Sequence, residues 1–198
     1  MEFITSTVTD IFFSVSPAWR IVLVFLSSFA EGLPVVGTVL PGGTIALLVG
    51  SLSETGFISP VTAVVVIAIG SFLGDSTGFF IGKYFKHVGW IKKLVSHEKH
   101  QTSWELFDRH IALIVIFGKL VPVVRSAPSF FAGARNVSTK KYLLFSALGS
   151  FLWALVGIYG GSALNRVFGP YAVPVILGIL VVSAVVALVS KKMKKKKE

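Results

Sequence analysis

Long uncharged stretches dominate this chain and indicate its class. They cover residues 32–53, 55–74, 142–165 and 167–190. About 20 apolar residues in a helix cross the hydrocarbon core of a bilayer. Hydrophobic residues make up 54% of the chain and charged residues only 14%, whereas about 25% of the residues of soluble domains are charged. The pattern therefore predicts an all-α, polytopic membrane protein.

Five membrane-embedded pieces follow from this pattern, all within one membrane domain at 19–190. They are predicted at 19–53, 58–84, 110–135, 141–165 and 170–190. The half-apolar residues 1–18 predict an N-terminal segment at the membrane interface. The polar residues 85–109 predict an amphipathic cytoplasmic segment, and 191–198 predict a basic cytoplasmic tail.

Two of these pieces, 19–53 and 110–135, are interrupted by residues that break helices. The apolar half at 111–120 spans about 15 Å as a helix, half of a roughly 30 Å hydrocarbon core. Both pieces are therefore predicted to be re-entrant hairpins that turn back inside the membrane. Two kinked but complete transmembrane helices are the alternative. The predicted tip residues are Pro34, Pro41, Gly42, Gly43, Pro122 and Pro128.

Basic residues indicate the orientation, because lysine and arginine favour cytoplasmic loops. They gather at 83–109, 135–141 and 191–198, which are therefore expected in the cytoplasm together with the C-terminus. The two hairpin-plus-helix units then have opposite orientations, an inverted repeat of the kind found in many secondary transporters. The net charge of +10 fits contact with anionic membrane lipids, and no nucleic-acid partner is expected.

Few charged residues lie within the predicted membrane pieces. They are Glu31, Asp75, Lys119 and Arg125, with Arg135 nearer the edge. A charge at the bilayer centre costs about 2.5–3.5 kcal/mol even on insertion scales, so a functional role is the default interpretation. Two acids and two bases also suggest mutual pairing. A purely structural ion pair that locks the two hairpins together is the alternative.

The two acids are candidate proton carriers. Glu31 has no basic neighbour in the sequence. Desolvation disfavours the charged form of an unpaired carboxyl, so Glu31 is expected to bind and release a proton. Asp75 borders glycines at 70, 74, 78 and 82, whose spacing predicts close helix packing. Asp75 is either a second proton or ion site or an acceptor for a hairpin amide.

The two bases point to an anion. Lys119 and Arg125 lie on either side of Pro122. Broken hairpins expose backbone amides and helix N-termini, which favour anions. Arginine can bind a phosphate with two hydrogen bonds, whereas lysine acts as a point charge. No metal, cofactor or nucleophile is expected, because "HEKH" at 97–100 lacks the spacing of a zinc motif and no serine has a histidine at matched spacing.

With these residues assembled, the chain resembles the DedA family of membrane proteins, which carry the VTT domain. The resemblance covers about 25–188 and is most specific in "FGKLVPVVRSAPSFFAGARNVSTKKY", with its ordered glycine, basic residue, proline and arginine. It implies a multi-pass protein of the bacterial or archaeal cytoplasmic (inner) membrane. Such a protein would move lipids between leaflets, either undecaprenyl phosphate or phospholipids such as phosphatidylethanolamine, with proton-motive force implicated for some members.

By position, the resemblance implies that Glu31 is the family's first acid, Asp75 its Gly-Asp acid and Arg125 the second base of the specific block. Two departures stand out. The first hairpin ends in "PGG" at 41–43, where many members have an acid in place of Gly43. Lys119 stands where arginine is usual, which excludes phosphate binding by two parallel hydrogen bonds at that position.

The first hypothesis is therefore a membrane transporter, not an enzyme, that flips a lipid with a phosphate headgroup, with undecaprenyl phosphate as the first candidate. Lys119, Arg125 and Arg135 would hold the phosphate, and Glu31 and Asp75 would couple protons. The alternatives are a phosphatidylethanolamine flippase or scramblase, and a proton-coupled exporter or channel for a small ion or cationic solute. A homo-oligomer is left open.

Overall fold

The structure, a computed structural model, describes residues 14–34, 36, 42–85, 87–88, 106–120, 125, 127–176 and 178. Every regular element within these residues is helical. The α-helices are α2 (Pro17–Gly32), α3 (Gly42–Ser53), α4 (Pro60–Phe85), α7 (Ile111–Phe117), α8 (Ala127–Ala134) and α9 (Thr139–Phe168). Two short 3-10 helices, η2 (Gly118–Leu120) and η3 (Gly169–Tyr171), follow α7 and α9. The prediction of an all-α protein is confirmed over the described residues.

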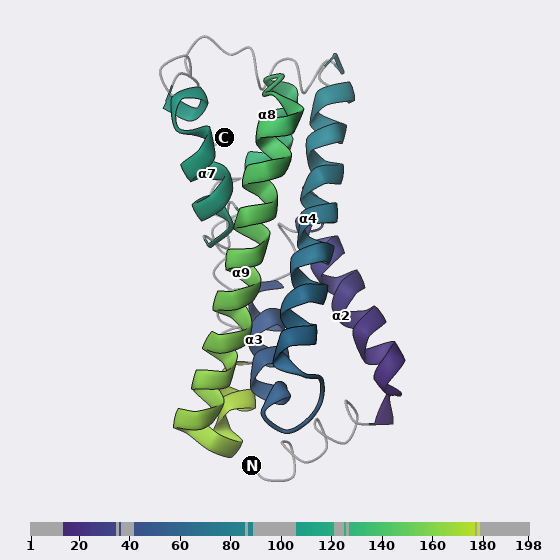
Figure 1. The fold of residues 1–198 in the computed structure, drawn as a ribbon, viewed down its shortest axis with the longest axis vertical. Helices are drawn as coiled ribbons and strands as arrows, with labels where there is room; N and C mark the ends of the chain where they lie inside the picture. The colour runs from purple at the N-terminus through teal and green to yellow at the C-terminus, as the bar shows by residue number, and fades with distance from the viewer. Residues whose placement is uncertain are drawn as a thin grey trace, which may run out of the picture.

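The helices α4 and α9 form the long axis of the molecule. They have 26 and 30 residues, and each is long and apolar enough to cross a membrane. They lie against one another and run in opposite directions (Figure 1). They occupy the regions predicted as helices at 58–84 and 141–165.

The shorter helices gather at the two ends of this pair. Helices α2 and α3 lie at one end, and α7 and α8 lie at the other (Figure 1). Helices α2 and α8 pack on α4, whereas α3 and α7 pack on α9. The regions 19–53 and 110–135 are thus each divided into two helices, as the helix-breaking residues predict.

Glycines allow these close approaches. A Cβ atom at Gly74 would overlap the main-chain oxygen of Phe29 in α2, and one at Gly82 would overlap that of Phe130 in α8. The helix α9 shows the same design, because Gly161 meets the main-chain oxygen of Leu47 in α3. The predicted packing role of the α4 glycines is therefore confirmed.

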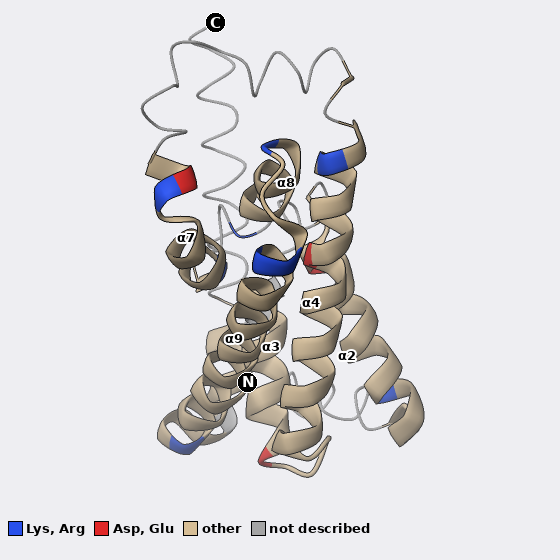
Figure 2. Ribbon diagram, turned by 45° about the horizontal axis from the view of Figure 1, so that its top comes forward, with Lys and Arg blue, Asp and Glu red and all other residues tan. Residues whose placement is uncertain are grey.

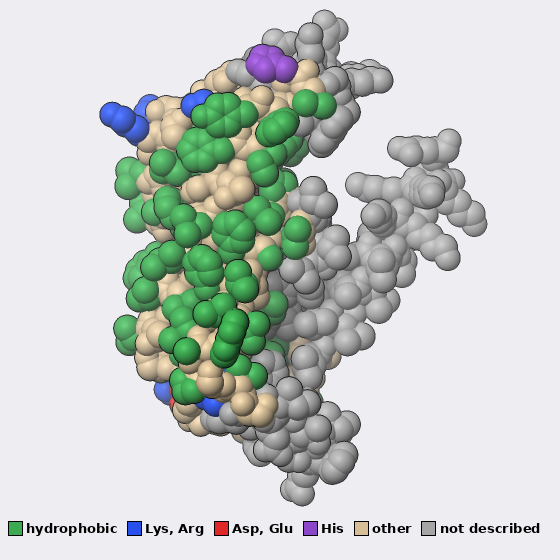
Figure 3. All heavy atoms as spheres, turned by 90° about the vertical axis from the view of Figure 1, so that its right-hand side faces the viewer, with side chains coloured by type: hydrophobic (Ala, Val, Ile, Leu, Met, Phe, Trp, Pro, Cys, Tyr) green, Lys and Arg blue, Asp and Glu red, His purple; other side chains and the backbone are tan. Residues whose placement is uncertain are grey.

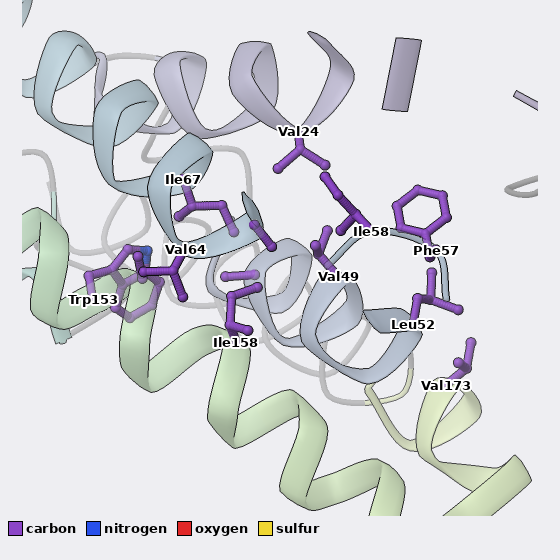
Figure 4. Packing of buried hydrophobic residues seen from close by; sticks show 13 residues of the cluster. Val24, Val49, Leu52, Phe57, Ile58, Val64, Ile67, Trp153, Ile158 and Val173 are labelled. Atoms are coloured by element: carbon purple, nitrogen blue, oxygen red, sulfur yellow. The ribbon is translucent and has the colours of Figure 1, made fainter. Parts of the chain in front are cut away.

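Apolar side chains fill the space between α3, α4 and α9. Val64 and Ile67 of α4 point toward Ile158 of α9, and Val49 lies opposite Val24 of α2 (Figure 4). The outside is also apolar: hydrophobic side chains spread over the described part of one face, with lysines and arginines near its ends (Figure 3). An apolar exterior of this kind matches a lipid environment.

Several predicted segments lie outside the described residues. They are most of the interfacial segment 1–18, positions 89–105 of the amphipathic segment, most of the helix at 170–190 and the whole tail at 191–198. Pro41 and Pro122, two of the predicted tip residues, also lie outside them, while Pro34 is the second residue after α2 and Pro128 is the second residue of α8.

Candidate functional site

Four charged side chains are buried together where the shorter helices meet α4. Glu31 lies near the C-terminal end of α2, Asp75 lies in α4, Lys119 lies in η2 and Arg125 lies just before α8. Each is at most 3% exposed. Acidic and basic segments meet about midway along the bundle, while the other charged segments lie nearer its ends (Figure 2). We call these four residues the charge cluster.

The charge cluster consists of two ion pairs. Arg125 Nη1 donates a hydrogen bond to Glu31 Oε1, and Lys119 Nζ lies 2.7 Å from Asp75 Oδ2. Its formal charge is zero, which lowers the large cost of burying each ion. The mutual pairing suggested by the sequence is present. The expectation that Glu31 has no partner is wrong, because the fold brings Arg125, 94 positions away, onto it.

Two buried serines join the cations of the charge cluster. Lys119 Nζ donates to Ser150 Oγ at 2.6 Å, and Arg125 Nη2 donates to Ser71 Oγ at 3.0 Å. Ser150 Oγ in turn donates to Ser71 Oγ at 3.4 Å. Both serines were missed by the reasoning from sequence. A signal for them exists, since each stands in a Gly-Ser-Phe-Leu segment, at 70–73 and 149–152.

Helix α9 supplies further contacts to the same place. Lys119 Nζ also donates to the main-chain oxygen of Ser146 at 2.8 Å. Tyr142 donates from its hydroxyl to the main-chain oxygen of Asp75 at 3.1 Å, and its ring stacks on that of Phe79. These contacts hold α9 against η2 and α4, the two elements that carry the ion pair between Asp75 and Lys119.

Trp153 covers the guanidinium of Arg125. The Arg125 Cζ atom lies 4.5 Å from the centroid of the Trp153 ring, the geometry of a cation–π contact. The ring also lies against Gly43, where a Cβ atom would come within 2.9 Å of Trp153 Cη2. The indole therefore lies beside Gly43, the position at which the family resemblance predicts an acid. The missed signal is a tryptophan in the middle of an apolar helix, far from the interfacial positions that tryptophans usually take.

Besides Asp75 Oδ2, which is ion-paired with Lys119, three buried polar atoms around the cluster have no hydrogen-bond partner among the described residues: Asp75 Oδ1, Arg125 Nε and Trp153 Nε1. Buried polar groups in folded proteins are nearly always hydrogen-bonded. Two of the three are N–H donors, and they belong to side chains that lie against one another. The site can therefore offer two further hydrogen bonds to an oxygen-bearing ligand or to water.

The remaining predicted site residues lie elsewhere. Arg135 follows α8, is about one-third exposed, and donates to Asp108 instead of joining the charge cluster. Pro34 packs against Gly78, and Pro128 packs against Gly118, so both described prolines have packing roles. No group of metal-ligating side chains occurs in the part of the chain that the structure describes.

Comparison with known proteins places these features in a family context. The VTT domain matches residues 40–163. Protein DedA of Escherichia coli K12 is 27% identical over 153 residues, which is 72% of this chain and 68% of DedA. Inner membrane protein YghB of the same organism is 24% identical and covers 73% of this chain and 68% of YghB. Inner membrane protein YohD is 29% identical over 74% of this chain and 76% of YohD. No solved structure gives a significant match.

Proposed function

This chain belongs to the VTT-domain (DedA) family of membrane proteins, and from that premise we propose that it transports a lipid with a phosphate headgroup across its membrane. Undecaprenyl phosphate is the first candidate for the cargo. In this proposal the protein carries out no chemical step on the lipid. It lies in the cytoplasmic membrane with its C-terminus in the cytoplasm, and protons drive the transport.

The observation that carries the proposal is the surroundings of Arg125 and Lys119. Both cations are buried, and each is neutralised by a carboxylate. A phosphate headgroup has the same sign of charge as these carboxylates and several acceptor oxygens, so it can replace them. The N–H groups of Arg125 Nε and Trp153 Nε1, which lack partners among the described residues, suit such an oxygen. They favour an anionic cargo over the cationic solute of the alternative hypothesis.

The two acids provide a route for proton coupling. In its paired state the charge cluster has a formal charge of zero. Protonation of Glu31 and Asp75 would leave two uncompensated cations, and a phosphate would then be the ion that neutralises them. Proton binding and lipid binding therefore favour each other, and by linkage each raises the affinity for the other.

The arrangement of helices supports two re-entrant hairpins in an inverted repeat. Helices α2 and α3 have 16 and 12 residues, about 24 and 18 Å at 1.5 Å per residue, which is shorter than a roughly 30 Å membrane core. The main helix contacts of the two sets correspond: α2 packs on α4 as α7 packs on α9, and α3 packs on α9 as α8 packs on α4. Alternating access around a fixed site is a common use of such repeats.

A vesicle assay tests the proposal. The purified protein is reconstituted into liposomes that contain radiolabelled undecaprenyl phosphate, and a phosphatase added outside cleaves only lipid in the outer leaflet. Wild-type protein should expose the inner-leaflet pool to cleavage, faster with an imposed pH gradient. The Arg125→Ala variant should expose almost none of it. Arg135→Ala is the matched control, because Arg135 lies outside the charge cluster.

Parallel vesicles distinguish the alternatives. Fluorescent phosphatidylethanolamine replaces the phosphate lipid in one set, and a cation-sensitive dye is trapped in another. Transport of either cargo without movement of the phosphate lipid overturns the proposal in favour of that cargo. Full activity of Arg125→Ala overturns the role of the charge cluster.

A further inference from the structure

The two cations of the charge cluster differ in how many hydrogen bonds they can still donate. A lysine ammonium group has three N–H donors. Lys119 Nζ lies 2.7 Å from Asp75 Oδ2, 2.6 Å from Ser150 Oγ and 2.8 Å from the main-chain oxygen of Ser146. These three oxygens use all of its donors. Lys119 therefore gains a new acceptor only by giving up one of its present partners.

Arg125 still has a donor without a partner. A guanidinium group carries five N–H donors in a fixed planar arrangement. Nη1 donates to Glu31, and Nη2 donates to Ser71 Oγ at 3.0 Å. Nε is buried and has no hydrogen-bond partner among the described residues. Arg125 can therefore bind a further acceptor while both of its present hydrogen bonds remain.

Trp153 places a second donor of the same kind beside the first. Its side chain is buried, with 6% exposed, and the Arg125 Cζ atom lies 4.5 Å from the centroid of its ring. An indole can donate one hydrogen bond and accept none, and within the described part of the chain no acceptor lies within reach of Nε1. Two buried donors without partners, on side chains in contact, point to one ligand that accepts from both.

The starts of two helices surround these donors. A Cβ atom at Gly43 would come within 2.9 Å of Cη2 and 3.3 Å of Cζ2 of the indole. Because Cζ2 and Nε1 are bonded to the same ring carbon, the edge that carries the N–H faces the first turn of α3, which begins at Gly42. Helix α8 begins at Ala127, two residues after Arg125. Helix N-termini favour negative charge, so this place suits an anion.

We propose that Trp153 is a headgroup-binding residue, and that Trp153 Nε1 and Arg125 Nε together donate hydrogen bonds to one phosphate group. A phosphate has several acceptor oxygens and can accept both. This inference rests on the proposed function and deepens it, because it identifies where the phosphate makes its first contact. In that contact Lys119 stays paired with Asp75, and no carboxylate has yet been displaced.

The indole N–H supplies a direct readout of this contact. In a variant with Trp19, Trp90 and Trp104 replaced by phenylalanine, Trp153 is the only tryptophan. Its indole is labelled with 15N, and the protein is placed in lipid nanodiscs at a fixed neutral pH. Undecaprenyl phosphate, undecaprenol or inorganic phosphate is then added. The N–H signal should move downfield in a saturable way with undecaprenyl phosphate and stay in place with undecaprenol, which has the same tail without the phosphate.

A binding measurement without tryptophan labelling provides the second test. Trp153→Phe keeps an aromatic ring over Arg125 but removes the N–H. Loss of a hydrogen bond to a charged group should weaken the binding of radiolabelled undecaprenyl phosphate in nanodiscs about 10-fold. Trp19→Phe is the matched control, because the same substitution is made at a side chain that is 62% exposed, and it should bind like wild type.

Three results overturn the inference: no movement of the N–H signal with undecaprenyl phosphate, an equal movement with undecaprenol, or wild-type affinity in Trp153→Phe. A signal that moves with inorganic phosphate but not with the lipid would identify free phosphate as the ligand and overturn the headgroup assignment. Circular dichroism identifies a variant that fails to fold, and the labelled protein keeps Trp153 and tests the contact without that substitution. Both measurements follow binding and not transport, so this inference and the proposed function can fail separately.

Discussion

The two halves of the chain, 17–85 and 111–168, have the same order of elements but opposite charges. Each has two shorter helices followed by a long one. Each has a Pro-Val-Val segment after its first helix, at 34–36 and 122–124, and a Gly-Ser-Phe-Leu segment in its long helix. Three positions before Pro-Val-Val, however, the first half has Glu31 and the second half has Lys119.

This difference explains why the site needs both halves. The first half supplies both acids of the charge cluster, and the second half supplies both bases. Either half alone would bury two like charges without compensation, which is highly unfavourable. Docking of the halves neutralises both sets at once. The shared order of elements thus supplies the framework, and the difference in charge between the halves supplies the site.

A second difference concerns the residue that follows Gly-Ser-Phe-Leu. In α4 this residue is Gly74, which lets the main chain of α2 approach closely. In α9 it is Trp153, whose ring lies between Gly43 and the guanidinium of Arg125. Where α4 has a close helix contact at Gly74, α9 therefore has the large side chain of Trp153. This replacement makes the surroundings of Arg125 unlike those of Lys119.

The largest effect should come from breaking the charge balance between the halves. Arg125→Gln leaves Glu31 buried without its partner, and loss of one member of a buried pair costs about 3–5 kcal/mol. The double variant Glu31→Gln/Arg125→Gln removes both charges and should recover most of that stability while transport stays absent. Unfolding of the detergent-solubilised protein by denaturant gives the free energies. A double variant as unstable as Arg125→Gln would show that charge balance is not what the pair provides.

Equivalent glycines of the two halves should give the next largest effect. A Cβ atom at Gly82 or at Gly161 would overlap a main-chain oxygen of the neighbouring helix. Overpacking of this kind costs about 1–3 kcal/mol, so Gly82→Ala and Gly161→Ala should lower the melting temperature similarly. At Gly160, in contrast, the nearest atom is the end of the flexible Leu47 side chain, at 3.3 Å. Gly160→Ala is therefore the control, and equal losses at 160 and 161 would contradict the close packing described above.

The sequence allowed much of this framework to be predicted. Long apolar stretches and their proline and glycine interruptions predict helices and breaks, because these are local properties of the backbone. Helix α2 ends at Gly32 before α3 begins at Gly42, and η2 ends at Leu120 before α8 begins at Ala127, as the helix-breaking residues predict. The charges within apolar pieces also indicated all four members of the charge cluster, since a charge in such a place is costly unless it is used or paired.

The partners within the site could not be predicted in the same way. Glu31 and Arg125 are far apart in the chain, and their contact depends on how α2 and the residues before α8 dock on α4. Arg135 lies only one helix beyond Arg125, yet the fold places it in an exposed pair with Asp108. Trp153 has an apolar neighbourhood in the sequence, so its contact with a cation becomes visible only in three dimensions.

A smaller effect on stability is expected from substitutions at Gly43 and Trp153, where the two halves differ. Gly43→Ala would push against Cη2 and Cζ2 of the Trp153 ring and displace it from Arg125. Trp153→Phe removes those two atoms, so the double variant should be more stable than the sum of the single changes predicts. Residues in contact typically show such coupling at about 0.5–3 kcal/mol, and we expect about 1 kcal/mol here. A double-mutant cycle of unfolding free energies checks this, and strict additivity would mean that Gly43 and Trp153 do not share the space.

The smallest effect should come from the contact that ties α3 to the far end of α9. Glu54, just after α3, accepts hydrogen bonds from Ser162 Oγ and from Arg166 Nη2, the latter at 3.0 Å. The bond from Ser162 and then that from Arg166 hold the pKa of Glu54 below its ordinary value of 4.5. Because the folded pKa is the lower one, the contact stabilises the protein above the ordinary value, and this stabilisation is lost as the pH falls through the folded pKa.

Glu54→Gln should therefore lower the melting temperature slightly at pH 7, and the difference from wild type should vanish in strong acid. High salt should shrink the difference at pH 7, because the contact is exposed and screened. Asp108→Asn is the matched control, since Asp108 lies just before the second half and its pair with Arg135 ties no part of the first half to the second. If the halves are held together mainly by the buried charge cluster, both variants keep wild-type transport. A loss of transport in Glu54→Gln alone would instead show that the contact of Glu54 with Ser162 and Arg166 takes part in transport. The functional difference between the halves would then include this contact near the membrane surface.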